Sequence, residues 1–260
     1  HRVNGGDSYY HSLQTSINKR FSSGYSVGLN YTWSKSLDTS SQNASSDFNN
    51  TNTMSADYYN TKGNSKAVST FHLNHVLGGN FTWQIPFMRD VGGAAQAILG
   101  GWSVSGLFNI TSGTPVTLEA NDRINWENDL TNGSGSRPTL IPGGNNNPVT
   151  GNINNWFDVN QFVLGERGYM GDLGRLTGRG DDFANFDFAL KKDAQLAEDV
   201  SLQFRAEFFN LLNHPNFATP TGSNRRPYSS TKLSKNSKFG RLTRTDNDAR
   251  QIQFALKILF

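Results

Sequence analysis

The hydrophobic residues of this chain alternate with polar residues. In the final stretch, "RQIQFALKILF", apolar side chains occupy the even positions from Ile252 to Phe260, whereas Gln251, Gln253 and Lys257 fall on odd positions. A period of two is typical of a strand that has one apolar face and one polar face. The pattern therefore predicts an amphipathic terminal strand whose last residue is aromatic.

The same alternation occurs in six further stretches: residues 11–21, 26–34, 72–87, 101–113, 183–192 and 200–209. In the first of them, Leu13, Ile17 and Phe21 share a face opposite Asn18 and Arg20. Each run is about 9–11 residues long or slightly more, which is the length that a tilted strand needs to cross a bilayer. We therefore predict seven antiparallel strands and an all-β fold.

Short and long links between these strands alternate strictly. The short links are residues 22–24, 89–101 and 193–199, and the long ones are residues 38–70, 114–182 and 211–249. This order is typical of an antiparallel transmembrane β-barrel with short periplasmic turns and long extracellular loops. Because bacterial barrels have an even number of strands, we expect residues 1–260 to be the C-terminal portion of one larger barrel domain. An additional pair of strands could also lie in residues 114–182, around "NWFDVNQFVL".

The composition fits such a barrel and excludes several other classes. No apolar run approaches 18 residues, so a transmembrane helix is excluded, whereas alternating barrel strands give a low mean hydropathy such as the −0.57 found here. The absence of cysteine excludes disulfides and cysteine-based metal sites. A net charge of +3 gives no argument for binding nucleic acid.

Aromatic residues near the strand ends are candidates for an interfacial belt, and the last strand resembles the assembly signal of outer-membrane barrels. Phe21 and Phe87 are further candidates for the belt. The insertion machinery would read the terminal strand as an exposed edge, so the barrel-assembly machinery is an expected partner. The residues assigned to the belt and the signal are Trp33, Trp83, Trp102, Phe254, Ile258 and Phe260.

Four phrases, in the same order, resemble the C-terminal barrel of TonB-dependent receptors of the Oar-like kind. They are "YHSLQTSINKRFSSGYSVGLNYTWSKSLD", "ILGGWSVSGLFNITSGTPVTL", "GRLTGRGDDFANFDFALKKD" and "LQFRAEFFNLLNHPNFATP". The resemblance implies a large outer-membrane barrel whose N-terminal plug domain and earlier strands are absent from residues 1–260. It implies uptake of a bulky nutrient, such as a carbohydrate, a peptide or a metal chelate, and coupling to the TonB system through the plug. It implies no cofactor.

Two other functions remain open at this point. One is a non-transporting outer-membrane barrel or adhesin whose loops bind a partner. The other is a soluble, glycan-binding β-sandwich in which the alternating faces would be core and solvent. The sandwich is disfavoured because its outward faces should not display Trp33, Trp83 and Trp102 in phase with long apolar rows.

The candidate chemical groups give weak signals. Asp122, Glu127 and Asp129 could bind a cation, but their spacing does not match an EF-hand, and a solvated acidic loop is favoured. His72 and His75 would lie on opposite faces of a strand. We assemble no catalytic triad and expect no enzyme, no metal and no cofactor. The remaining residues considered are His11, His214 and the tripeptide Arg179, Gly180 and Asp181, which is interpreted as a turn at the barrel rim.

The two longest loops carry opposite charge. Residues 114–182 contain nine acidic residues against five arginines, whereas residues 211–249 are basic. The basic loop could meet lipopolysaccharide phosphates or an anionic ligand, or the two loops could simply pack together. Its basic residues include Arg225, Arg226, Lys232, Lys235 and Lys238. The residues expected to line the barrel interior are Gln14, Asn18, Arg20, Asn74, Gln84, Gln203, Arg205 and Glu207.

Overall fold

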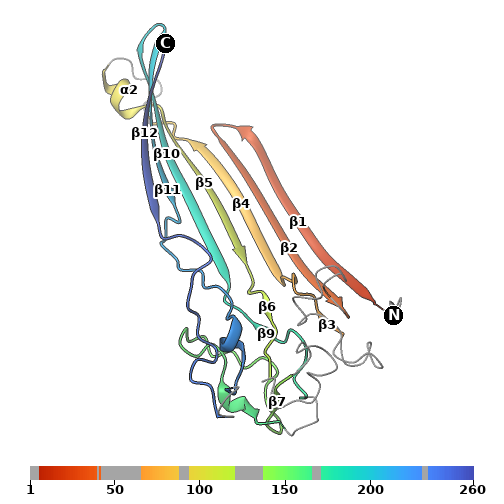
Figure 1. The fold of residues 1–260 in the computed structure, drawn as a ribbon. Coiled ribbons are helices and arrows are strands. Elements are labelled where there is room, and N and C mark those ends of the chain that lie inside the picture. Colours follow the sequence, from red (N-terminus) through yellow and green to blue (C-terminus); the bar gives the residue numbers. More distant parts are fainter. Residues whose placement is uncertain are drawn as a thin grey trace.

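Seven long strands form one continuous antiparallel sheet in this computed structural model, which describes residues 6–39, 41, 66–87, 94–120, 137–165, 171–229 and 234–260. The order of the strands across the sheet is β1-β2-β4-β5-β10-β11-β12, which follows their order along the chain (Figure 1). Their bounds are Ser8–Ser22 (β1), Tyr25–Asp38 (β2), His75–Gln84 (β4), Trp102–Thr111 (β5), Phe183–Ala197 (β10), Val200–Phe209 (β11) and Gln251–Leu259 (β12).

All seven strands predicted from alternation are confirmed, although several of their ends are shifted, as the third and fifth strands show. The third begins at His75 and not at residue 72, because residues 69–74 form part of the preceding loop. The fifth continues to Ala197, so its link to β11 shrinks to Glu198 and Asp199. Alternation weakens at these ends, where the sequence no longer distinguishes strand from loop.

The register of the sheet brings most large apolar residues of the seven strands onto one face. Phe186 lies opposite Phe108, Leu13 opposite Trp33, and Leu202 opposite Ile258. The other face collects the polar partners, for example Ser16 opposite Asn30. Because a slip of one residue would reverse every side chain, this agreement fixes the pairing of the strands. The apolar face includes Ile17, Val27, Leu29, Leu77, Phe81, Trp83, Val104, Ile110, Phe188, Leu190, Phe204, Phe208, Ile252, Phe254 and Leu256.

This apolar face is exposed, and the buried hydrophobic residues lie elsewhere. Leu13, Trp33 and Phe254 are 57%, 56% and 69% exposed. Among the described residues of the seven strands, Ala206 is the one buried hydrophobic residue. No second long-stranded sheet is present among the described residues to cover the apolar side. The soluble β-sandwich is therefore wrong, since its apolar faces would be packed together.

The predicted alternation of short and long links is also confirmed. The turn between β1 and β2 consists of Ser23 and Gly24, which both have positive φ angles of 54° and 82°. Positive φ at both central residues is typical of a type I′ hairpin turn, which matches the twist of the strands. The link between β4 and β5 contains a short helix, α2 (Ala94–Leu99). The long loops extend from the opposite end of the sheet, where they form a separate folded layer (Figure 1).

Within the described residues, the loop layer contains only short secondary-structure elements. They are β3 (Ala67–Val68), β6 (Pro115–Val116), β7 (Thr139–Leu140), β8 (Phe162–Val163) and β9 (Gly178–Arg179), with two 3-10 turns, η2 (Val159–Gln161) and η3 (Gly222–Arg225). The extra pair of barrel strands considered for residues 114–182 is not found in the described part of that loop, because its strands are two residues long and pair outside the main sheet. No helix of the described residues is long and apolar enough to span a membrane.

Glycine and phenylalanine pack against each other across the apolar face of β4 and β5. Phe81 lies opposite Gly106, and Phe108 lies opposite Gly79. A Cβ atom at Gly79 would come within 2.5 Å of the Phe108 ring and 3.0 Å of the Gly28 carbonyl oxygen. Each phenylalanine ring therefore occupies the space over a glycine that has no side chain. Such cross-strand pairs of an aromatic residue and a glycine stabilise strands that contain glycine.

Two adjacent glycines of β4 provide a matched test of this packing. We expect Gly79→Ala to lower the free energy of unfolding by about 1–3 kcal/mol, as overpacking does, because the Phe108 ring must move. Gly78→Ala should be neutral or slightly stabilising, since its Cβ would meet only a carbonyl oxygen at 3.9 Å. The measurement is chemical unfolding of the protein in detergent, which covers the apolar face. Equal effects of the two substitutions would contradict this account.

Candidate functional site

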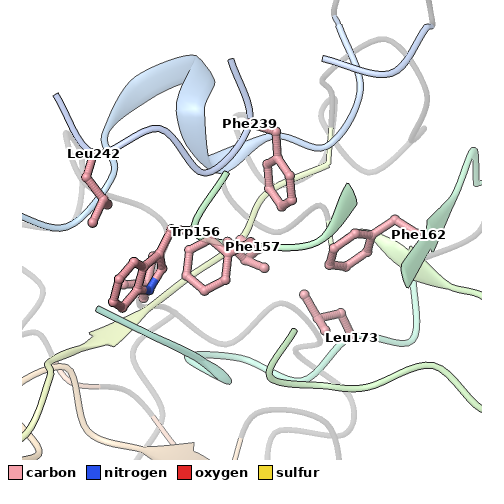
Figure 2. Close-up of a cluster of buried hydrophobic side chains, with 8 residues drawn as sticks. Trp156, Phe157, Phe162, Leu173, Phe239 and Leu242 are labelled. Carbon is pink, nitrogen blue, oxygen red and sulfur yellow. The ribbon is translucent and has the colours of Figure 1, made fainter. Parts of the chain in front are cut away.

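The loop layer is held together by a hydrophobic core of its own. Phe157, Phe162 and Phe239 meet at its centre, with ring centroids 6.0 Å apart for Phe157 and Phe239 and 5.6 Å apart for Phe162 and Phe239 (Figure 2). Phe157 and Leu173 are fully buried. The cluster combines residues of the two longest loops. Residues 114–182 contribute Val116, Leu118, Trp156, Phe157, Phe162 and Leu173, and residues 211–249 contribute Phe239 and Leu242. We call this part of the structure the loop body.

Ion pairs join the same two loops at the surface of this core. Glu119 accepts from Arg225 at 2.7 Å and from Arg226 at 3.1 Å. Lys235 donates to the side-chain oxygen of Asn160 at 2.7 Å. The prediction that the acidic and basic loops pack together is thus confirmed for the described residues. Lys232 lies outside them.

The pairing between β5 and β10 resumes beyond the sheet as the pairing between β6 and β9. Phe183 lies opposite Thr111, and Arg179 lies opposite Pro115, so the register is the same after a break of three residues on each side. At the break, a Cβ atom on Gly113 would be 2.0 Å from the Gly180 carbonyl oxygen, so only glycine permits this approach. The loop body is therefore an extension of two strands of the sheet.

Asparagine side chains fix the start of the last long loop. Asn216, which is 2% exposed, pairs with the backbone of Ala184, accepting from its N–H at 2.6 Å and donating to its carbonyl at 3.0 Å. Asn210 donates to the carbonyls of His214 and Asp248, both at 3.1 Å. Amides can satisfy backbone donors and acceptors that leave a strand. These residues belong to the phrase "FFNLLNHPNF", and their bonds give it a structural role.

A buried ion pair connects the end of β2 to the loop of residues 114–182. The guanidinium of Arg175 binds the carboxylate of Asp38, and it also donates to the Asp38 carbonyl at 2.8 Å. The two side chains are 3% and 4% exposed. Ser41 donates to the same carboxylate at 2.8 Å, so the pair has the additional hydrogen bonds that a buried charge requires.

His72 replaces a backbone partner where the pairing of β2 changes from β4 to β3. Its Nδ1 accepts from the Ser36 backbone N–H at 3.2 Å, and its Nε2 contacts the side-chain oxygen of Asn74. Burial lowers the pKa of His72, which the hydrogen bond with Asn74 partly offsets. His75 lies apart from it, with Nδ1 2.8 Å from the Tyr31 hydroxyl. The predicted placement of both histidines in one strand is wrong, since β4 begins at His75 and His72 lies in the preceding loop.

A pocket of about 520 Å³ lies between β3 and the loop of residues 114–182, which includes β9. Its wall includes four cationic side chains, Lys66, Arg137, Arg175 and Arg179, and one carboxylate, Asp172. Burial lowers the pKa of Arg179, which nevertheless stays protonated because guanidinium titrates far above neutral pH. Arg179 was assigned to a turn at the rim, whereas it lies in β9 with its side chain in this pocket wall.

The polar face of the sheet forms a second surface. Gln203 donates to Asp193 at 2.9 Å, Lys191 pairs with the same carboxylate at 2.8 Å, and Arg205 lies 3.4 Å from Glu207. The register confirms that six of the predicted interior residues share this face: Gln14, Asn18, Gln84, Gln203, Arg205 and Glu207. Arg20 lies at an irregularity of the register between Lys19 and Ser22, so its face stays a prediction. Asn74 precedes β4. Two large apolar residues, Leu107 and Phe209, interrupt the polar surface beside a shallow pocket of about 330 Å³.

The residues proposed for the belt and the assembly signal lie at three levels along the sheet. Trp83 and Trp102 lie at the end of the sheet that carries the short turns, where Phe21 and the C-terminal residues Ile258 and Phe260 also lie. Phe87 follows β4 at this end, where Ile85 still bonds to Trp102. Trp33 lies towards the loop body, opposite His75. Phe254, in the middle of β12, stacks on Phe204 with ring centroids 6.3 Å apart. Their roles as belt and assembly signal stay predictions.

The other candidate residues do not form a common site. Asp122, Glu127 and Asp129 lie outside the described residues. Within the described ranges, no three His, Asp or Glu side chains are grouped so that they could hold a metal ion. His11 lies in β1 opposite Lys35, and His214 lies 3.3 Å from the Asn216 side-chain oxygen. Asp181 and Asp182 accept from backbone N–H groups of Phe217 and Gly113 at 3.5 Å and 2.7 Å.

Sequence reasoning missed the loop body and its pocket. The run "NWFDVNQFVL" contains Trp156, Phe157 and Phe162, which are three of the core residues, and an aromatic-rich run in a long loop is a usable signal for a packed core. The pocket residues Lys66, Arg137 and Arg179 are far apart in the sequence, so no local sequence pattern predicts that they line one pocket.

The chain was compared with protein families, with curated proteins and with solved structures. Residues 1–253 match the family described as outer membrane beta barrel domain. The comparisons with curated proteins and with solved structures gave no match.

The buried pair of Asp38 and Arg175 generates the first prediction for the loops. Arg175→Met should destabilise the loop body by about 3–5 kcal/mol, because it leaves the Asp38 carboxylate buried without its cation. Limited proteolysis of the folded protein should then cut the loops faster. Arg244→Met is the control, since its ion pair with Asp246 is exposed and long at 3.8 Å. Unchanged cleavage in the Arg175 variant would contradict the role given to the pair.

A second prediction follows from His72. Because folding lowers its pKa, the unfolded state binds the proton more readily, so this residue stabilises the loop above its ordinary pKa of about 6.5. That stability should be lost as the pH falls below about 6.5 and towards the lower folded value. Proteolysis of residues near β3 should therefore be faster at mildly acidic pH than at pH 7.5. His72→Gln should remove most of this pH dependence; an unaltered pH profile would refute the assignment.

Proposed function

Because the chain belongs to the family of outer membrane β-barrel domains, and is thus a protein of the cell outer membrane, we propose that it is part of a receptor that takes up a bulky nutrient. In this proposal the nutrient is a carbohydrate, a peptide or a metal chelate that passes through a plugged barrel. The energy comes from the inner membrane through the TonB system, which contacts the plug. The protein acts as a receptor and not as an enzyme.

The observation that carries the proposal is the loop body. Two long loops share one hydrophobic core and cross-loop ion pairs, so they present a defined surface at one end of the sheet. Preorganised loops bind a ligand at a lower entropic cost than flexible ones. Such a surface suits capture of a solute outside the cell, where long barrel loops lie.

The polar face of the sheet supports the plugged barrel. Since the apolar face meets lipid, the polar face is the interior. Leu107 and Phe209 interrupt its polar residues beside Asp187 and Glu207. A mixed surface of this kind fits contact with another protein domain better than contact with water alone. The proposed occupant is the plug that the four resembling phrases imply.

Further partners belong to the same proposal. Outer-membrane lipid and lipopolysaccharide would surround the apolar face and its aromatic ends, and the barrel-assembly machinery would recognise β12. No role for nucleic acid is proposed. A second candidate, a non-transporting barrel or adhesin, is favoured by the same rigid loop body, since a partner could bind it without any uptake.

Uptake distinguishes the two candidates. A strain that lacks the protein and a strain that lacks TonB should both leave the same compounds unused in a defined mixture of oligosaccharides, peptides and metal chelates. The measurement is mass spectrometry of the spent medium, with the parent strain and a complemented strain as controls. If both strains consume every compound that the parent consumes, while the deletion strain loses adhesion to surfaces or cells, the adhesin would replace the receptor.

A further inference from the structure

The pocket beside β9 contains a cation for which the described residues supply no counterion. The guanidinium of Arg179 has no ion pair or side-chain hydrogen bond among the described residues, although the residue is half-buried. The neighbouring Arg175 differs, because Asp38 neutralises it. A charge that is partly removed from water without a partner is costly, so the fold holds Arg179 in a position that an external anion would stabilise.

The other side chains of the pocket reinforce this positive potential. Lys66 and Arg137 add two cations to the wall, whereas Asp172 is the one carboxylate among the described wall residues, and one of its oxygens accepts from the Leu140 backbone N–H at 2.8 Å. Asn146 and Asn147 are exposed at the same wall and offer amide donors and acceptors. A planar guanidinium matches carboxylate and phosphate groups with two parallel hydrogen bonds.

We infer that this pocket binds the oxyanion of a hydroxylated, sugar-sized solute, with Arg179 contacting a carboxylate or phosphate group and the asparagine amides contacting hydroxyls. A volume of about 520 Å³ lies within the usual range for small-molecule pockets. The inference rests on the proposed function only for the step that follows binding, which is uptake. It narrows the nutrient to an acidic saccharide or a sugar phosphate.

The position of Arg179 is fixed independently of its side chain. The Trp156 indole N–H donates to the Arg179 carbonyl at 2.7 Å, and the residue pairs with Pro115 across β6 and β9. A substitution that changes only the side chain therefore leaves these backbone contacts in place. This makes Arg179→Gln a suitable variant, because it removes the charge and keeps an amide.

The test is isothermal titration calorimetry on the intact protein in detergent with three ligands that share a ring: glucuronate, glucose 6-phosphate and neutral glucose. We expect the two anions to bind and glucose to bind much more weakly or not at all. Arg179→Gln should weaken anion binding by roughly 10- to 100-fold, the value of one or two charge-assisted hydrogen bonds. Arg179→Lys should retain part of the affinity, since it keeps the charge and loses the planar fork.

Arg244→Gln is the matched control, because it removes an exposed arginine from the same loop body and should bind like the parent. Heat-modifiable gel migration checks that each variant is folded. Equal affinity of the parent and Arg179→Gln, or equal affinity for glucose and the anions, would overturn the inference. Binding of purified lipopolysaccharide without any binding of the sugar anions would also overturn it, since the oxyanion would then come from the membrane and not from a solute.

The outcomes separate this inference from the proposed function. If the sugar anions bind through Arg179 but the TonB-deficient strain still takes them up, the pocket stands and the proposed energy coupling fails. If the TonB comparison succeeds for some compound while Arg179→Gln binds the sugar anions like the parent, the pocket assignment fails alone.

Discussion

The structure depends on the pairing of backbone polar groups inside a lipid bilayer. Lipid offers no hydrogen-bond partners, so each N–H and C=O within the membrane must pair with another strand. A continuous antiparallel sheet of seven strands meets this need for its inner strands, and alternation then assigns one side chain to lipid and the next to the interior. The exposed apolar face and the low mean hydropathy are two results of this one constraint.

The same constraint explains why the hydrophobic core lies in the loops. A sheet whose apolar face meets lipid has no need to pack that face against another layer. The loops extend into water, where the hydrophobic effect acts on them as it does on a soluble domain. Phe157, Phe162 and Phe239 therefore cluster there, and each buried side chain of this size contributes about 1.5–3 kcal/mol. The loop body follows the rules of a small soluble domain, whereas the sheet follows those of a membrane protein.

The contrast between the two parts determines what the sequence could predict. The positions of the strands are encoded locally, because the alternation of apolar and polar residues indicates which face each side chain occupies. All seven strands follow from that alternation. The loop core depends on contacts between residues far apart in sequence, such as Phe157 with Phe239 and Asp38 with Arg175. The role of His72 was hidden for a related reason, since its ring replaces a backbone group in a ladder whose break is visible only in three dimensions.

Arg179 shows how the two parts are connected. It lies in β9, which continues the register of β5 and β10 after the close approach of Gly113 and Gly180. A residue of the pocket wall is thus linked to the strands of the sheet by a pairing that resumes in the same register after three residues on each side. A ligand on this side chain would meet a site whose position relative to the barrel is set before binding, which reduces the ordering cost of capture. The two segments also approach closely at the break itself, where the Gly180 N–H donates to the Thr114 carbonyl at 2.9 Å, so backbone contacts continue from the sheet to the strand that carries Arg179.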